Sequence, residues 1–182
     1  MCIRDRLRAS LKPFAGTFDG GSVSFIVSDI SGSAYWSLDS SHRYVLAARA
    51  RLANAFGASR DRIPPAQRLY AGGGGSVRGY EARFVGELDN NGDPIGGRSA
   101  AEFGVEMRTR IAHNIGLVPF LEAGAVSESV VPDLDASVQF GAGLGLRYYT
   151  AVGPLRADLA FPLDKRDADD AFQFYLSIGQ AF

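Results

Sequence analysis

FGAGLGLRYYTAVGPLRADLAFPLD, residues 140–164, alternates between apolar and polar or glycine positions on both sides of a short turn. Apolar residues occupy the even positions of residues 140–148 and the odd positions of residues 155–161. A period of two residues is typical of a β-strand with one apolar face. The intervening turn, residues 151–154, contains the glycine and proline that favour chain reversal. The stretch therefore predicts two antiparallel strands joined by a tight turn.

The same alternation, with less clarity, runs along most of the chain and predicts an all-β protein. Turn-rich stretches separate the alternating segments, as in antiparallel barrels and sandwiches. The second segment contains Ser31, Gly32 and Ser33, which are expected to interrupt it. We count eight strands and no helix, at residues 7–18, 23–38, 44–52, 102–111, 117–126, 140–148, 155–161 and 172–182.

The lengths of the connections also alternate. Short links at residues 39–42, 112–115 and 151–154 take turns with longer ones at residues 127–138, 164–170 and, above all, 58–101. Short turns at one end and long loops at the other are typical of outer-membrane barrels. Several strands also carry arginine and glutamate on one face and apolar residues on the other, as lipid outside and water inside require. We therefore predict an antiparallel transmembrane β-barrel, with a soluble β-sandwich as the alternative.

Composition excludes several other classes of protein. The 182 residues are 46% hydrophobic with a net charge of only -1, which gives no electrostatic footprint for nucleic acid and argues against disorder. No apolar run is long enough for a helical membrane span. Of the 19 basic residues 17 are arginines, which suit planar pairing with carboxylates. Residues 1–6 have no apolar signal-peptide core, so we expect a non-native or truncated start, and they hold the sole cysteine, Cys2.

The longest loop contains RLYAGGGGSVRGY, residues 68–80. Its four consecutive glycines, residues 72–75, are expected to lack regular secondary structure and to allow another chain segment to come close. No lysine followed by serine or threonine is present, so the segment does not form a nucleotide-binding phosphate loop. The arginine that follows the glycines, Arg78, is therefore predicted to be aimed at a partner group.

Four motifs in a fixed order carry a resemblance to a known family. They are residues 68–80, GDPIGGRS at residues 92–99, residues 140–164, and IGQAF at residues 178–182. Together they resemble the TamA family, the outer-membrane subunits of translocation and assembly modules, within the wider family of BamA-type assembly barrels (bacterial surface antigens). The resemblance covers residues 7–182 and implies the C-terminal eight strands of a 16-stranded barrel, with POTRA domains elsewhere in the protein and the loop at residues 58–101 folded inward.

The resemblance also implies a pair of site motifs. In the family, a loop tetrad matched here by Val77, Arg78, Gly79 and Tyr80 docks its arginine on an acidic residue of the barrel wall. The wall motif F-x-D-x-G is matched by Phe120, Glu122 and Gly124, with glutamate in place of aspartate. The extra methylene leaves a bidentate ion pair feasible. This pair is expected to lock the loop and keep the wall in register.

The last predicted strand is a candidate for a lateral seam and a C-terminal assembly signal. Its residues on one face are aromatic or aliphatic, and a terminal aromatic is either an anchor at the membrane interface or part of a signal for the assembly machinery. Gln180 departs from the hydrophobic residue that is usual in that signal. The seam residues are Phe172, Phe174, Leu176, Ile178 and Phe182.

The resemblance implies a non-enzymatic function in the bacterial outer membrane. The protein is expected to insert or secrete autotransporter-type proteins through a laterally opening barrel, with outer-membrane lipid around it, client outer-membrane proteins, and a TamB-type periplasm-spanning partner. The alternatives are a two-partner secretion transporter of the same superfamily and a soluble sandwich that binds a ligand. No serine, histidine and carboxylate set suggests catalysis. We expect no cofactor and no metal, since His42 and His113 lie at turns and residues 89–93 lack the closing acid of a calcium loop.

Overall fold

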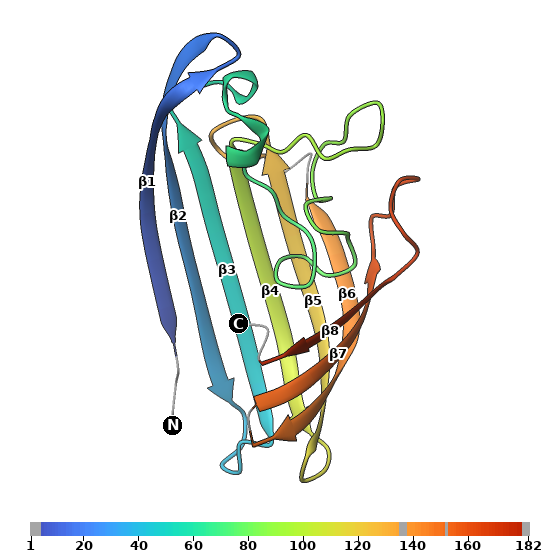
Figure 1. Ribbon diagram of the computed structural model, residues 1–182. Coiled ribbons are helices and arrows are strands. Elements are labelled where there is room, and N and C mark those ends of the chain that lie inside the picture. The colour runs from blue at the N-terminus through green and yellow to red at the C-terminus, as the bar shows by residue number, and fades with distance from the viewer. Residues whose placement is uncertain (1–4, 135–137, 152, 180–182) are drawn as a thin grey trace.

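The computed structural model describes residues 5–134, 138–151 and 153–179, and these form one antiparallel β-sheet (Figure 1). Each strand pairs with its neighbours in sequence, in the order β1 to β8. The prediction of eight antiparallel strands is therefore confirmed. The strands are β1 (Arg6–Phe18), β2 (Gly21–Ser37), β3 (Tyr44–Phe56), β4 (Ser99–Arg110), β5 (Ile115–Ser127), β6 (Gln139–Thr150), β7 (Gly153–Pro162) and β8 (Gln173–Ile178).

Two short 3₁₀-helices, η1 (Arg60–Arg62) and η2 (Pro65–Gln67), are the helical elements assigned in the described ranges. Neither they nor any other described segment forms a helix that is long and apolar enough to cross a membrane. The expected break in the second strand is wrong. β2 continues through Ser31, Gly32 and Ser33 because each of the three pairs with a residue of β1 and a residue of β3. Pairing on both sides thus outweighs the weak strand preference of small residues.

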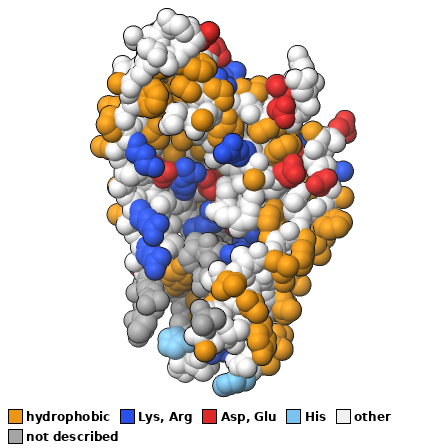
Figure 2. All heavy atoms as spheres, viewed as in Figure 1, with side chains coloured by type: hydrophobic (Ala, Val, Ile, Leu, Met, Phe, Trp, Pro, Cys, Tyr) orange, Lys and Arg blue, Asp and Glu red, His pale blue; other side chains and the backbone are white. Residues whose placement is uncertain are grey.

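The two faces of the sheet differ in chemistry. Large apolar side chains such as Phe103, Leu121 and Leu144 are exposed on one face, whereas Glu106 and Asp158 are buried on the other. In the view of Figure 2, basic side chains gather over the middle of the molecule and apolar side chains line its right-hand edge. A soluble sandwich would bury its apolar face between two sheets. Because the described strands form a single sheet with its apolar face outward, the alternative of a sandwich is wrong.

The connections separate by length at the two ends of the sheet. Three short turns join β2 to β3, β4 to β5 and β6 to β7 at the lower end of Figure 1. The long loops lie at the upper end, together with one tight turn between β1 and β2 at Asp19 and Gly20. The longest loop occupies residues 57–98, slightly earlier than the expected 58–101, because residues 99–101 already belong to β4.

This longest loop lies in the concavity of the curled sheet and provides five of the eight residues of one of two buried apolar clusters. In Figure 1 it descends in front of β4 and β5, and β7 and β8 cross over the sheet to meet it. Apolar loop side chains pack against small residues of the inner face. The buried cluster consists of Ala53, Leu69, Ala71, Val77, Tyr80, Val85, Ala100 and Val126. This cluster is thus a contact between the loop and the sheet, while the second cluster consists of Val23 and Phe25 of β2, Ala55 of β3 and the loop residue Ile63.

Candidate functional site

Arg78 reaches the inner face of the sheet on a tight backbone turn. The preceding glycines Gly72 and Gly73 both have positive φ angles, and Gly79 has φ +105°. A Cβ atom at Gly79 would lie 2.8 Å from the backbone carbonyl of Phe161 in β7. Only glycine combines this φ with so close an approach. The tetrad therefore docks its backbone directly on the wall.

The structure brings Arg78 and Glu122 together in a bidentate ion pair. Arg78 Nε donates to Glu122 Oε2 at 3.0 Å, and Nη2 donates to Oε1 at 2.8 Å. The backbone N–H of Arg78 donates to the same Oε2 at 2.8 Å. One carboxylate of β5 thus holds both the side chain and the backbone of the loop residue. The glutamate in place of aspartate gives good hydrogen-bond geometry at all three contacts.

Two further carboxylates and an aromatic ring complete the surroundings of Arg78. Glu106 of β4 accepts from Nη2 at 2.7 Å, and Asp158 of β7 accepts from Nη1 at 3.1 Å. The guanidinium carbon lies 3.5 Å from the ring centroid of Phe120, a cation–π contact. The wall motif pointed to Phe120 and Glu122, whereas Glu106 and Asp158 were missed as partners. Their only signal in the sequence is their place on the polar face of an alternating strand.

Charge is closely matched around this buried arginine. Arg78 is 0% exposed, and the three carboxylates are buried as well. Burial alone would lower the pKa of Arg78, but the hydrogen bond and charge of Glu122, with the charges of Glu106 and Asp158, raise the pKa above its ordinary value. The guanidinium therefore stays charged. Asp158 also pairs with Arg147 of β6 and Arg156 of β7. These two arginines of the barrel wall neutralise the negative charge that exceeds the single positive charge of Arg78.

Glycines on the wall make room for the tetrad. A Cβ atom at Gly124 would lie 2.6 Å from Val77 Cγ2, so the last position of the wall motif accommodates the first residue of the tetrad. A Cβ atom at Gly141 of β6 would overlap the carbonyl oxygen of Arg78. One at Gly143 would overlap the ring of Phe120. The alternating glycines of β6 thus leave the space in which the tetrad and Phe120 pack against the strand.

Tyr80, the last residue of the tetrad, is fully buried, and its hydroxyl donates to the carbonyl oxygen of Phe140 at 3.0 Å. Burial raises the pKa of Tyr80 to about 12, so the hydroxyl remains a donor. Through this bond the loop is tied to the start of β6. All four tetrad residues therefore have a structural contact with the wall.

A contact that sequence analysis missed joins the tetrad to the last described strand. The hydroxyl of Tyr175 in β8 accepts from the backbone N–H of Gly79 at 3.2 Å and donates to the carbonyl oxygen of Tyr80 at 2.9 Å. A Cβ atom at Gly74 would lie 2.8 Å from the Tyr175 ring. The glycine run thus lets the loop backbone pack on this ring. Only the position of Tyr175 on the polar side of the predicted strand hinted at this role.

The predicted seam residues lie on the opposite side of β8. Phe174, Leu176 and Ile178 belong to the strand and are exposed on the apolar face, and Phe172 precedes the strand and is exposed too. Phe182 lies outside the described residues. β8 therefore presents apolar side chains outward while Tyr175 holds the loop inward.

Neither histidine takes part in a site. His42 lies in the turn after β2 and His113 in the turn after β4, and both are exposed. Among the residues that the structure describes, no group of three or more histidine, cysteine or acidic side chains could hold a metal ion. The polar interior is instead composed of ion pairs between arginines and carboxylates.

Comparison with known proteins identifies the family. Residues 7–182 match the Omp85 superfamily domain. The chain belongs to this superfamily. The outer membrane assembly factor BamA of Nitratidesulfovibrio vulgaris is 33% identical over 93% of this chain and 22% of its own length. That of Neisseria meningitidis serogroup B is 24% identical over 81% of this chain and 23% of its own length.

Solved structures agree with this assignment. The crystal structure of BamA from Haemophilus ducreyi lacking POTRA domains 1–3 superposes with a TM-score of 0.73 at 25% identity, covering 93% of this chain and 37% of the other. The chain thus spans less than a quarter of the two curated relatives and little more than a third of this structure. Membership of the Omp85 superfamily places the protein in the bacterial outer membrane, as predicted.

Proposed function

We propose that the intact protein is a non-enzymatic factor that assembles other proteins into the bacterial outer membrane. Support comes from the superfamily match and from two relatives that are themselves named outer membrane protein assembly factors. The observation that carries the proposal is the buried cluster of Arg78 with Glu106, Glu122 and Asp158. These ion pairs hold the loop at residues 57–98 against the inner face of the sheet. A barrel that handles polypeptide chains needs a lumen of defined shape, and a fixed loop provides one.

Residues 7–182 are, in this proposal, the C-terminal eight strands of a 16-stranded barrel, with POTRA domains elsewhere in the protein. β1 and β8 each pair with a single neighbour in the described sheet, so each has an edge that can bind another strand. Eight strands alone would close into a barrel whose interior is filled by its own side chains. The loop at residues 57–98 needs a wider lumen than that.

The tetrad and its wall partners act as a lock in this mechanism. Arg78 joins β4, β5 and β7 through their carboxylates, and Tyr175 extends the connection to β8. The loop is therefore bound to the inner face of β8. The free edge of the same strand forms the seam. When the seam parts, the exposed edge of β8 can pair with a strand of the client protein.

A disulfide across the seam tests this mechanism in the full-length protein. Leu176→Cys in β8, paired with a cysteine in the first strand of the barrel, should stop the assembly of a client protein in proteoliposomes. Reduction should restore assembly. The matched control is the pair Leu144→Cys and Leu159→Cys, which are register partners in β6 and β7. Undiminished assembly with the seam closed would overturn lateral opening.

The finer proposal is that the protein serves autotransporter-type clients together with a TamB-type partner. It is supported by the four ordered motifs at residues 68–80, 92–99, 140–164 and 178–182. Deleting the gene should lower the surface level of autotransporters and leave most other outer-membrane proteins unchanged. In a separate experiment, the TamB-type protein should co-purify with the full-length protein from undeleted cells. A general loss of outer-membrane proteins would instead favour a BamA-type role, and loss of one dedicated exported protein a two-partner secretion transporter.

A further inference from the structure

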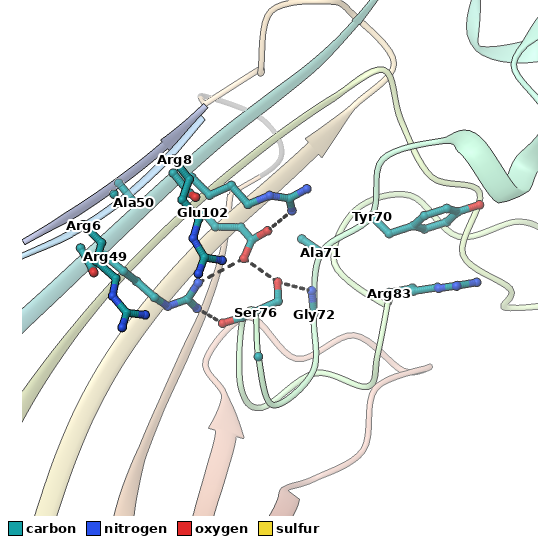
Figure 3. Close-up of a pocket in the computed structure, with 15 residues that line it drawn as sticks. Arg6, Arg8, Arg49, Ala50, Tyr70, Ala71, Gly72, Ser76, Arg83 and Glu102 are labelled. Atoms are coloured by element: carbon teal, nitrogen blue, oxygen red, sulfur yellow. Dashed lines mark hydrogen bonds and ion pairs between the residues drawn. The ribbon is translucent and has the colours of Figure 1, made fainter. Parts of the chain in front are cut away.

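A second group of arginines surrounds a cavity of about 470 Å³ between strands β1 to β3 and the loop (Figure 3). Arg6 and Arg8 of β1 line it from one side of β2, and Arg49 and Arg51 of β3 from the other. In the close-up, Arg6, Arg8 and Arg49 lie together near Glu102, and the loop residues Gly72 and Ser76 face them. We call this group the arginine trough.

Strand register aligns the four arginines into two rows. Arg6 is opposite Ser33, which is opposite Arg49, while Arg8 is opposite Ser31, which is opposite Arg51. Residues two apart on a strand share a face, so the two serines form a floor between two pairs of arginines. The small side chains of the floor leave the space that the cavity occupies. The segment predicted to break β2 is therefore the floor of the trough.

Carboxylates neutralise only one wall of the trough. On β3, Arg51 pairs with Asp29 at 2.8 Å and with Glu102 at 2.6 Å. Arg49 pairs with Glu102 at 3.3 Å and with Glu122 at 3.1 Å. Glu102 also accepts a hydrogen bond from the Ser76 hydroxyl at 2.8 Å, so it binds the loop as well as both arginines of β3.

On the β1 wall, neither Arg6 nor Arg8 has an ion pair with a described residue, and both are exposed. Five arginines line the cavity, namely Arg6, Arg8, Arg49, Arg51 and, from the loop, Arg83, against one lining carboxylate among the described residues, that of Glu102.

We propose that the arginine trough binds a soluble ligand that carries a phosphate group. A planar carboxylate offers two oxygens in one plane, whereas a tetrahedral phosphate can accept hydrogen bonds from both walls and from serine hydroxyls of the floor. A phosphate dianion also supplies negative charge to a lining in which arginines outnumber carboxylates. The planar guanidinium group of arginine, with its several N–H donors, suits this anion better than the compact ammonium group of lysine.

The ligand is a soluble one because of where the trough lies. The trough is on the inner face of β1 to β3, and the residues on the other face of these strands, such as Leu7, Leu11 and Leu52, are exposed apolar side chains that suit lipid. A lipid headgroup would have to leave the membrane to reach it. Bound phosphate would also contact the loop, since Gly72, Gly75 and Ser76 line the same cavity. Binding should therefore favour the inward position of the loop.

Calorimetry with inorganic pyrophosphate tests the proposal on the full-length protein in a phosphate-free detergent. Ionic strength is held constant with sodium chloride, so that only specific binding is measured. We expect saturable binding at one site. Arg8→Gln should weaken it about tenfold, since a hydrogen bond to a charged group contributes about that factor. Arg8→Lys should recover only part of the loss, because it restores charge without the fork.

Two further variants separate the trough from general electrostatics. Arg43→Gln removes an exposed arginine outside the cavity and should leave binding unchanged, while Ser31→Val should abolish binding by filling the floor. Native electrophoretic mobility shows that each variant is folded. The proposal is wrong if pyrophosphate binds no better than chloride or if the β1 arginines do not matter. Equal affinity for malonate or an acidic peptide would also overturn it, in favour of a carboxylate site.

Discussion

The cluster around Arg78 and the arginine trough use the same residue type on the same face of one sheet, yet they differ in burial and charge balance. Arg78 is fully buried, and carboxylates from β4, β5 and β7 surround it. Arg6 and Arg8 are exposed and have no ion pair with a described residue. A buried arginine with every charge matched serves structure, whereas exposed arginines that form no ion pair with the described residues are available to a ligand.

The largest effect should come from Arg78→Ala. The change leaves three carboxylates buried without their shared cation, and breaking a buried ion pair in this way costs about 3–5 kcal/mol. We expect a large fall in the free energy of unfolding, measured by urea titration in detergent, together with rapid proteolysis of the loop at residues 57–98. Arg43→Ala, at an exposed turn, is the control. A loop that stays resistant to protease would show that other contacts hold it.

Gly141→Ala should have the next largest effect, because the new methyl group would overlap the carbonyl oxygen of Arg78. Overpacking of this kind costs about 1–3 kcal/mol. The matched control is Gly75→Ala, where a Cβ atom would meet nothing within 4 Å. Urea titration of the two variants should give a clear loss for the first and little change for the second. Equal stability would mean that the loop backbone does not rest on β6.

The amino-acid sequence predicts the strands well and the site only in part. Alternation reveals each strand because one face meets lipid and the other water. The strands at residues 140–148 and 155–161 can therefore be predicted from their local sequence alone. Arg78 and Glu122 were suggested by family resemblance. Glu106 and Asp158 were not, because which residues of different strands lie at one height depends on register and curvature across the whole sheet. Ser31 to Ser33 were mistaken for a break for the same reason, since pairing with two neighbours overrides local preference.

A smaller effect is expected from Tyr175→Phe, which removes the bonds to Gly79 N–H and the Tyr80 carbonyl and leaves both backbone groups without these partners. An unsatisfied buried group costs about 1–3 kcal/mol, and water that reaches the half-buried site should keep the loss near the lower end. Hydrogen exchange should quicken at residues 72–80 and along β8. Tyr148→Phe, on the outer face, is the control. Faster exchange in the loop alone would indicate that the tetrad and β8 are not coupled.

The smallest effect on stability, and the sharpest contrast with Arg78, should come from Arg8→Gln. Because Arg8 has no ion pair with a described residue and shares a cavity with four other arginines, its removal relieves repulsion between like charges. We expect a slightly higher unfolding midpoint at low salt and no difference at high salt, where such repulsion between exposed charges is screened. Pyrophosphate should raise the midpoint of the natural protein more than that of Arg8→Gln. If Arg8→Gln instead destabilised the protein as Arg78→Ala does, the two arginine groups would share one structural role, and the distinction between a lock and a ligand site would be wrong.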